Sequence, residues 1–431
     1  MNFTGIIGGW YEKKRRELPW RQTGDPYRVW LSEVILQQTR IDQGMPYYLE
    51  FVRSYPDVHA LASATEDEVL KKWQGLGYYS RARNLLRAAR QVVDEWNGEF
   101  PASYKDLLTL RGVGSYTAAA VASICYGEPK AVVDGNVARF VARLYGVERP
   151  VNSTEGAREI EMLADRLMQE SVRRGLHAGN HNQAMMEFGS LQCVPASPDC
   201  SSCPFRGNCV AYASGLVDRL PVKRPKKKPV ERWLYYYIIV SGSELILQKR
   251  PEGDIWSSMY QFPVIESARP LPEEQILLQS WERLVRQMQA QVGAQVGAQV
   301  GQSGGAQPGG PAEGQAGEAE AGQPADTGEE QTGRPAEEEA YEAQAGGPAE
   351  GQAALESAPP DDYRTGYTIT GTSGTIRHQL SHRSLRARFI HVRLDYWPDP
   401  MPPGWIRVPL EQVDDYAVPR LIHRYMESMD F

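Results

Sequence analysis

The stretch Leu110-Arg111-Gly112-Val113-Gly114-Ser115-Tyr116-Thr117 lies between two predicted helices and decides how the N-terminal half of the chain folds. Gly112 and Gly114 let the backbone turn tightly and come close to a ligand, and the next helix presents free N–H groups at its first turn. Such a turn suits an anion, for example a nucleic-acid phosphate. Glycine turns between helices are common, so this stretch alone leaves a purely structural role equally open.

Helical periodicity continues on both sides of this turn. Amphipathic spacing predicts helices over Pro26–Arg40, Thr65–Lys72, Ser80–Trp96, Tyr104–Leu110, Tyr116–Tyr126, Gly135–Tyr145 and Ala157–Gln169. Asp134 follows the apolar pair Val132-Val133 and precedes a predicted helix, which is the usual position of an N-cap. Alternating strand patterns are absent from this half of the sequence. We therefore predict an all-α domain over residues 1–215.

Four of the five cysteines gather at the end of this domain. Cys193, Cys200, Cys203 and Cys209 have the spacing C-x6-C-x2-C-x5-C. Disulfide frameworks are typical of short secreted chains, whereas this chain has 431 residues and no signal-peptide pattern. Zinc ribbons usually carry two C-x2-C pairs, and this sequence has one, so the spacing favours a 4Fe-4S cluster over zinc.

These features also predict where the protein works. Thiol ligands and the missing export signal favour a cytoplasmic, nucleoid-associated protein. No apolar run reaches the ~18 residues that a membrane span needs, so we expect no membrane contact. Residues 287–362 carry fourteen acidic residues and one basic residue, so the remainder of a chain of net charge −7 has a net charge of +6. That mildly basic remainder is compatible with a polyanionic partner.

The composition changes twice after the helical domain. Residues 216–231 include the basic, proline-rich run PVKRPKKKP, predicted as a linker that is either a solvated spacer or a phosphate-contacting strap. Trp233–Val240, Leu245–Gln248 and Arg388–Leu394 are rich in β-branched and aromatic residues, which predicts an α/β domain over 232–431. A Gly-, Ala-, Gln- and Glu-rich insert at about 287–362 interrupts this domain and is predicted to be disordered.

The ordered motifs resemble the helix-hairpin-helix DNA glycosylase superfamily, in its adenine glycosylase (MutY) branch. The glycine hairpin, Asp134 and the four cysteines are similar to the superfamily in order and spacing. Leu18-Pro19-Trp20-Arg21 and Trp30–Thr39 (WLSEVILQQT) resemble the catalytic stretch of the adenine-specific branch, and Gly75–Arg83 (GLGYYSRAR) resembles its loop that enters DNA at the lesion. The resemblance implies a multidomain protein: an all-α glycosylase domain with a 4Fe-4S cluster loop at 193–209, and a Nudix-like α/β domain.

The resemblance also implies roles for particular residues. Glu33 lies on a predicted helix among apolar neighbours, so desolvation is expected to raise its pKa and keep it available as the general acid that protonates the departing adenine. Asp134, expected to be more hydrated and near a helix N-terminus, would stay ionised and stabilise the sugar cation. The other positions that the resemblance implicates are Tyr116 and Asn136 at the sugar, Arg21 and Glu187 at the extruded adenine, Gln38, Thr39, Leu76 and Tyr78 at the vacated gap, and Gly112 and Gly114 at the DNA backbone.

Tyr116 separates two reaction types. Lyases of the endonuclease III type carry a lysine there that forms a Schiff base, which tyrosine cannot form. We therefore expect a monofunctional base excision repair glycosylase that acts as a monomer on A·8-oxoguanine or A·G mispairs in double-stranded DNA and leaves an abasic site. The alternatives are an endonuclease III-like pyrimidine-damage glycosylase/lyase and a noncatalytic iron–sulfur DNA-binding protein. The presence of both Glu33 and Asp134 argues against the binder.

The C-terminal domain resembles the Nudix-like module with which adenine glycosylases recognise 8-oxoguanine. Arg250-Pro251, Trp256 and Gln261-Phe262-Pro263 match its early signature. The glutamate run that binds magnesium in Nudix hydrolases does not follow Pro263, so we expect a domain that binds without cutting. Ser381 and His382 match the family's recognition loop, in which Leu380 replaces a phenylalanine.

Overall fold

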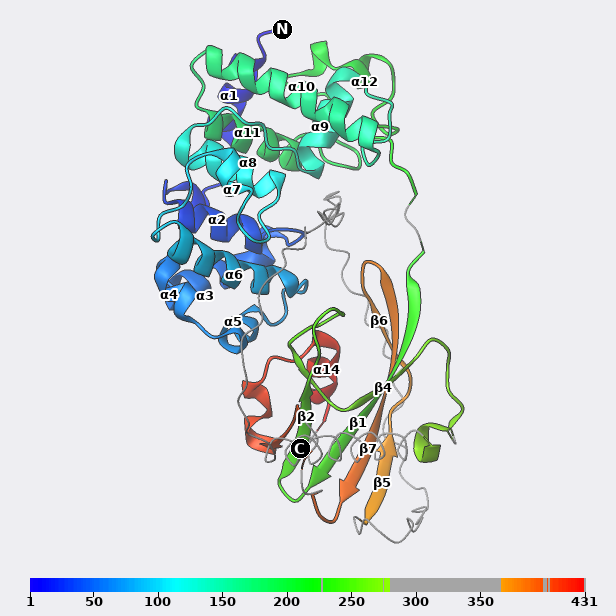
Figure 1. Ribbon diagram of the computed structural model, residues 1–431. Helices are drawn as coiled ribbons and strands as arrows, with labels where there is room; N and C mark the ends of the chain where they lie inside the picture. The colour runs from blue at the N-terminus through cyan, green and yellow to red at the C-terminus, as the bar shows by residue number, and fades with distance from the viewer. Residues whose placement is uncertain (226–227, 274, 280–365, 398–400, 402–403, 430–431) are drawn as a thin grey trace, which may run out of the picture. The chain divides into compact units, whose positions relative to one another are not determined.

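The computed structural model describes the chain except for residues 226–227, 274, 280–365, 398–400, 402–403 and 430–431 (Figure 1). The predicted insert at 287–362 lies outside the described residues. Contacts divide the chain into two units. The first unit is Met1–Lys227, and the second is made of Lys228–Asp254 together with most of the chain from Ser258 onward. None of the helices in the described part is long and apolar enough to cross a membrane.

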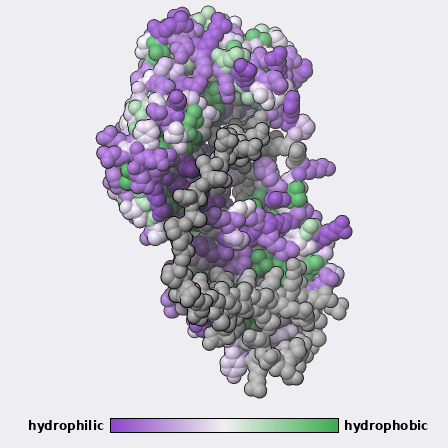
Figure 2. Space-filling view, in the orientation of Figure 1, coloured by the Kyte–Doolittle hydropathy of each residue, from purple (hydrophilic) through white to green (hydrophobic). Residues whose placement is uncertain are grey.

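Helices build the first unit, and no strand occurs among its described residues up to Pro225. The helices are α1 (Phe3–Lys14), α2 (Pro26–Ile35), α3 (Ile41–Ser54), α4 (Val58–Ser63), α5 (Glu66–Trp73), α6 (Ser80–Glu95), α7 (Tyr104–Leu107), α8 (Ser115–Tyr126), α9 (Gly135–Tyr145), α10 (Thr154–Arg173), α11 (Ala178–Leu191) and α12 (Val210–Ala213), with 3-10 turns η1 (Pro19–Arg21) and η2 (Arg206–Asn208). The surface of this unit in Figure 2 is largely hydrophilic, with apolar residues scattered over it.

Apolar burial fixes how these helices pack. Phe3 on α1, Phe140 on α9 and Phe188 on α11 meet Phe205 in a buried aromatic cluster with ring centroids 4.5 to 6.5 Å apart. Cys193, Cys203 and Cys209 pack against the same cluster. Burial of aromatic rings contributes strongly to core stability. The core of this unit is therefore continuous with the cysteine loop.

The predicted glycine turn joins α7 to α8. Gly112 has a φ of +71°, and a Cβ at this position would lie 2.5 Å from the Cβ of Asn84 on α6. Any other residue here would be strained and would displace α6. Gln91 on α6 also binds the turn, because its side-chain oxygen accepts from the Arg111 N–H at 3.0 Å and its amide donates to the Thr109 carbonyl at 3.3 Å. The turn is thus seated on α6 and begins α8 at Ser115.

Helix α2 ends at Ile35, although the sequence predicted a helix to Arg40. The Arg81 Nη1 donates to the carbonyls of Val34, Ile35 and Gln37 at 2.9, 3.0 and 2.7 Å. These carbonyls would otherwise accept from the next helical turn or remain unsatisfied. Gln38 adopts a left-handed φ of +55°. A cation from a distant helix therefore ends α2 and frees Gln37–Thr39 to form a turn.

A mixed sheet forms the second unit. Its strands are β1 (Val230–Ser241), β2 (Glu244–Lys249), β3 (Tyr260–Gln261), β4 (Val264–Ser267), β5 (Tyr367–Thr372), β6 (Ile376–Gln379), β7 (Arg383–Leu394) and β8 (Trp405–Pro409). The main order is β3-β2-β1-β7-β5, and β4, β6 and β8 pair with β1, β7 and β2. β1 and β7 run parallel; β1 is buried on both faces over Leu234–Ile239, whereas β7 largely alternates buried with partly exposed residues. Helix α14 (Arg420–Met426) stacks Tyr425 on Phe389 of β7 at 3.7 Å.

The three predicted strand segments lie inside β1, β2 and β7. The predicted linker, in contrast, is attached to the first unit over much of its length. The Arg143 Nε donates to the Leu220 carbonyl at 2.9 Å, and the Asn152 amide exchanges two hydrogen bonds with the backbone of Arg224 at 2.7 and 3.1 Å. Residues up to Arg224 therefore pack with the helices, and β1 begins at Val230.

Candidate active site

Glu33 lies on α2, which packs against α8, and its carboxyl hydrogen-bonds Tyr116 on that helix. Its neighbours Trp30, Leu31, Val34 and Ile35 are buried. Burial raises the pKa of the Glu33 carboxyl to about 7, with a smaller contribution in the same direction from the charge of Asp134. A hydrogen bond with Tyr116 and the charge of Arg21 oppose this rise in pKa. Near neutral pH this carboxyl is available both as an acid and as a base.

Tyr116 stands on the first turn of α8, directly after the glycine turn. Its hydroxyl hydrogen-bonds the Glu33 carboxyl and lies 3.3 Å from the Met186 sulfur on α11. Burial and the nearby carboxylates of Glu33 and Asp134 raise the pKa of this phenol well above its usual value. Tyr116 is therefore a neutral donor throughout the physiological pH range.

Asp134 is the N-cap of α9, as the sequence predicted. Its Oδ1 accepts from the Val137 N–H at 2.7 Å, and its Oδ2 accepts from the Asn136 side-chain amide at 2.7 Å. Burial is the largest cause and raises the pKa of Asp134 above its usual value, and these donors and the charge of Arg139 oppose the rise. Asp134 and Glu33 are both partly exposed, so the greater hydration expected for Asp134 stays a prediction. The fixed hydrogen-bond donors favour its ionised form.

Glu187 on α11 has the opposite environment. Its carboxylate is 1% exposed and accepts from the Arg16 backbone N–H, Nε and Nη2 at 2.8, 2.9 and 2.7 Å, and from the Arg21 Nη2 at 2.8 Å. Although burial opposes ionisation, these donors lower its pKa to about 2. Glu187 is therefore a permanent anion that holds two guanidinium groups, and the charge of one of them, Arg21, also reaches Glu33.

A second group of predicted residues meets at Arg81. In addition to the end of α2, the Arg81 Nη2 donates to the carbonyls of Leu76 and Gly77 at 3.4 and 3.3 Å and lies 3.5 Å from the Thr39 hydroxyl. Its guanidinium carbon lies 5.6 Å from the centre of the exposed Tyr78 ring. Leu76 itself is buried in this structure. Gln38, Thr39, Leu76 and Tyr78 therefore belong to two adjoining turns fastened by one buried cation.

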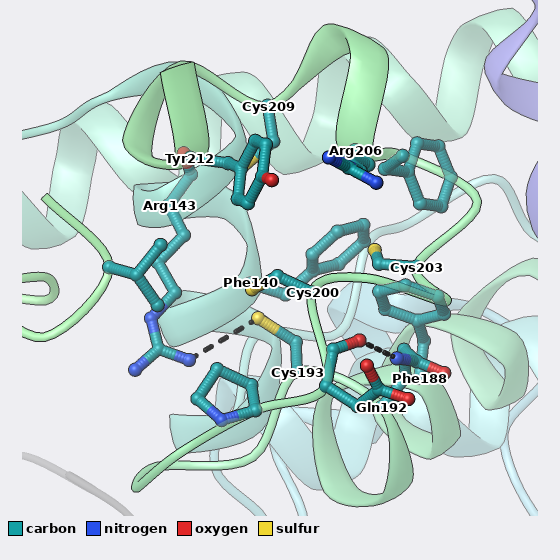
Figure 3. A pocket seen from close by; sticks show the side chains of 14 residues that line it. Phe140, Arg143, Phe188, Gln192, Cys193, Cys200, Cys203, Arg206, Cys209 and Tyr212 are labelled. Atoms are coloured by element: carbon teal, nitrogen blue, oxygen red, sulfur yellow. Dashed lines mark hydrogen bonds between the residues drawn. The ribbon is translucent and has the colours of Figure 1, made fainter. Parts of the chain in front are cut away.

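The four predicted thiol ligands line one pocket in the first unit (Figure 3). None of them forms a disulfide. The Cys209 thiol donates to the Arg143 carbonyl at 3.3 Å. The Arg143 Nη1 is 3.5 Å from the Cys193 sulfur, and the other guanidinium nitrogens bind the Leu220 and Pro195 carbonyls at 2.9 Å. A buried cation thus stands beside the Cys193 sulfur.

Ser381 and His382 lie in the second unit, in the exposed turn between β6 and β7. The Leu380 N–H donates to the Arg383 carbonyl at 2.8 Å, and the Gln379 side-chain amide donates to the carbonyls of Leu380 and Arg383 at 2.7 and 3.1 Å. These bonds close the turn and place both residues at its tip. Both residues are exposed at this turn.

Sequence reasoning missed Arg16 and gave Arg81 no role. Arg16 ends the run Lys13-Lys14-Arg15-Arg16, which has the composition of a solvated surface. Only the packing of α11 beside α1 brings Glu187 to it across 171 residues. Arg81 lies inside α6, an otherwise regular amphipathic helix. Nothing in the sequence of that helix indicates that the Arg81 side chain is buried.

Comparisons with known proteins find related DNA repair proteins. The family model of the HhH-GPD superfamily base excision DNA repair protein matches residues 31–166, which include Glu33, Tyr116 and Asp134. A curated "Adenine DNA glycosylase" from Buchnera aphidicola subsp. Baizongia pistaciae is 33% identical over 263 residues, covering 61% of this chain and 73% of that protein. Its counterpart from Buchnera aphidicola subsp. Acyrthosiphon pisum is 30% identical over 288 residues, covering 66% and 81%.

Among solved structures, a thermostable thymine-DNA glycosylase is 30% identical, with a TM-score of 0.45, and covers 49% of this chain and 95% of that one. The two adenine-specific relatives align over most of their own length, and the superfamily model spans both carboxylates of the site. The chain belongs to the adenine DNA glycosylase family.

Proposed function

We propose that the enzyme removes adenine from double-stranded DNA where adenine is paired with 8-oxoguanine or guanine, by hydrolysing the N-glycosidic bond. The observation that carries this proposal is a pair of carboxyl groups in different environments. Burial raises the pKa of both carboxyls, to about 7 at Glu33, but at Asp134 the Val137 N–H and the Asn136 amide oppose the rise and favour the anion. Two such carboxyls are what cleavage of a glycosidic bond requires.

Glu33 supplies the proton. Adenine is a poor leaving group until one of its ring nitrogens is protonated, so the acid must still hold its proton near neutral pH. Burial provides this property at Glu33, and the hydrogen bond with Tyr116 orients the carboxyl. After the base leaves, the ionised Glu33 is placed to accept a proton from the attacking water.

Asp134 stabilises the sugar. Departure of the base leaves positive charge on the deoxyribose ring, as in glycoside hydrolysis. The Asn136 amide and the N-terminus of α9 hold the carboxylate in place before the reaction begins. A preorganised anion stabilises developing positive charge without the cost of reorganising solvent.

The other predicted site residues of the first unit bind DNA. Arg16 and Arg21, held by Glu187, present planar donors at the pocket for the extruded adenine. The two turns that Arg81 fastens, with Gln38, Thr39, Leu76 and Tyr78, occupy and probe the gap that the base leaves. Gly112 and Gly114 bring backbone N–H groups of α8 to a DNA phosphate. Tyr116 replaces the lysine of lyases, so the product is an abasic site in an uncut strand.

We further propose that Cys193, Cys200, Cys203 and Cys209 hold a 4Fe-4S cluster. Among the described residues, no three His, Cys, Asp or Glu side chains lie close enough to share one metal ion. The four thiols line one pocket, and their spacing C-x6-C-x2-C-x5-C suits a 4Fe-4S cluster better than zinc. These four cysteines would hold the cluster, which would cross-link the segment 193–209 and fix its shape for contact with the phosphate backbone. Base hydrolysis needs no electron transfer.

The second unit completes the proposal. Its sheet, with parallel β1 and β7, supports a Nudix-like domain over 232–431 that follows a helical domain at 1–215 and a linker at 216–231. In the turn between β6 and β7, Ser381 and His382 offer hydrogen bonds to the edge of 8-oxoguanine. We propose that the protein acts as a monomer associated with the nucleoid.

Single-turnover base release tests the proposal. We expect wild type to release adenine from an A·8-oxoguanine duplex, Glu33→Gln to lose at least a thousandfold in rate, and the exposed-site control Glu161→Gln on α10 to retain the wild-type rate. Release of an oxidised pyrimidine in place of adenine would support the lyase alternative. Tight binding with no base release would support the noncatalytic alternative. Full activity of Glu33→Gln would refute the mechanism.

A further inference from the structure

Asn182 is a fully buried amide at the junction of three elements of the site. It lies on α11 and is 1% exposed. Its Nδ2 donates to the Ser123 hydroxyl on α8 and to the Lys130 carbonyl, both at 2.8 Å, and its Oδ1 accepts from the Val132 N–H at 2.9 Å. These bonds use both amide protons and one of the two lone pairs of the oxygen.

The segment that Asn182 binds leads directly to Asp134. Two of the three bonds go to the backbone at Lys130 and Val132, and Asp134 follows Val132 by two residues. This segment has no regular secondary structure, so no strand or helix ladder holds it. The amide supplies the backbone partners that such a ladder would otherwise provide. The Asn182 amide therefore fixes the position at which the backbone enters α9, and with it the position of the Asp134 carboxylate at the N-cap.

The same contact reaches Tyr116. The side chain of Val132 is 1% exposed and belongs to a small apolar cluster with Ala119 and Ala120, against which Tyr116 and Met186 pack. Pinning the Val132 N–H therefore also fixes the surface on which the Tyr116 ring rests. One amide thus relates the residue that stabilises the sugar to the residue that orients Glu33.

We infer that Asn182 is a positioning residue for base excision, which holds Asp134 and Tyr116 in register so that the negative charge meets the sugar cation. This inference rests on the proposed function. Asn182 touches no substrate, and its effect passes through the backbone of 130–132. Displacement of a preorganised charge by a fraction of an ångström weakens the stabilisation of the transition state more than the binding of a neutral ligand.

Asp165 on α10 provides a matched comparison. Its carboxylate accepts from the Ala131 N–H at 3.2 Å and from the Lys130 Nζ at 3.0 Å, so it holds the same segment from the other side. Its side chain is 38% exposed, however, and water can replace the bonds that it makes. The buried amide has no such substitute.

The test compares Asn182→Leu, which keeps the approximate volume, Asn182→Asp, which keeps the acceptor for Val132, and Asp165→Ala. Single-turnover release of adenine from A·8-oxoguanine DNA is measured for each variant. Affinity is measured for two duplexes opposite 8-oxoguanine, one with a cationic pyrrolidine in place of the sugar and one with a neutral tetrahydrofuran. Circular dichroism and thermal unfolding report folding.

We expect Asn182→Leu to slow base release at least thirtyfold and to lower the ratio of cationic to neutral affinity about tenfold. Asn182→Asp should lose less of the base-release rate and, like the leucine variant, lose affinity for the cationic duplex and not for the neutral one. This variant keeps the test valid if Asn182→Leu does not fold. Asp165→Ala should stay within threefold of wild type. Neutral-duplex affinity should remain within threefold for every folded variant.

Two results would overturn the inference. One is a folded Asn182 variant with the wild-type rate. The other is a loss of rate in which both duplexes lose affinity equally, because that pattern indicates general structural damage. Inactive wild-type enzyme would instead refute the proposed function, so the two failures are distinguishable.

Discussion

The two sides of the active site treat the same carboxyl group in opposite ways. On α2, Glu33 has few fixed donors, and burial raises its pKa to about 7. On α11, Glu187 is more deeply buried, yet four donated hydrogen bonds from Arg16 and Arg21 lower its pKa to about 2. Burial alone therefore does not decide the protonation state. The number and charge of the donors decide it.

The two carboxyl groups of the proposed site are therefore suited to different roles. A carboxyl that is poised near neutrality can transfer a proton, whereas one that is permanently ionised can hold cations in place. The helices that bury Glu33 place few polar groups beside its carboxyl, and the Tyr116 hydroxyl is one of them. The arginines that could have neutralised its reactivity are instead bound by Glu187.

The pH dependence of base release should show the largest consequence of this contrast. Glu33 must carry its proton to act as an acid, and burial raises its pKa to about 7. Above this pH the protonated fraction falls tenfold per pH unit, so the single-turnover rate at pH 9 should be about fiftyfold below that at pH 7. The measurement uses enzyme in excess over DNA.

Binding of DNA is measured at each pH as the control, because saturation must hold throughout. A rate that stays constant from pH 7 to pH 9 under saturation would contradict the assignment of Glu33 as the acid. Glu187 cannot produce this profile, since its pKa of about 2 keeps it ionised across the whole range.

The same substitution on the two sides should change stability in opposite directions. At pH 8 the folded protein must keep Glu33 ionised against its raised pKa, so Glu33→Gln should stabilise the fold, by about 2 kcal/mol. Glu187 has a lowered pKa and contributes stability above its unfolded pKa, so Glu187→Gln should destabilise by about 2 kcal/mol or more. Urea unfolding measures both.

The pH series distinguishes these effects from packing changes. The gain from Glu33→Gln should disappear as the pH falls from about 7 towards the ordinary value of 4.5, where the folded wild type no longer carries the charge. The loss from Glu187→Gln should shrink only as the pH falls from about 4.5 towards 2. Equal signs for the two variants at pH 8 would show that the contrast is wrong.

The local parts of this site were predictable from the sequence. Asp134 stands where an apolar run meets a helix, and it is the N-cap of α9 with the expected bond to the backbone. Glu33 lies on a helix among apolar residues, and the predicted direction of its pKa shift is confirmed, with burial as the largest cause. Both inferences needed only neighbours within a few residues.

The tertiary parts were not predictable from one sequence. The helix that starts at Pro26 ends five residues before its predicted end because Arg81, from another helix, binds its last carbonyls. The raised pKa of Asp134 depends on burial that its local sequence does not show. Arg16, Arg81 and Asn182 all act across more than 40 residues, and each has a surface-type side chain that local reasoning assigns to solvent.

The Tyr116 hydroxyl should have the smallest of these effects, because it is the one uncharged donor on the Glu33 side. Burial raises the pKa of Glu33 and the Tyr116 hydrogen bond opposes the rise, so Tyr116→Phe should raise that pKa further, by about half a unit. The alkaline limb of the rate profile should move to higher pH, while the rate below pH 7 falls about threefold as orientation is lost. Tyr104→Phe, in the same apolar cluster, is the control and should leave the profile in place. A limb that moves to lower pH would mean that the hydroxyl stabilises protonated Glu33. The Tyr116 donor would then act on the Glu33 pKa in the opposite direction to the donors that lower the Glu187 pKa.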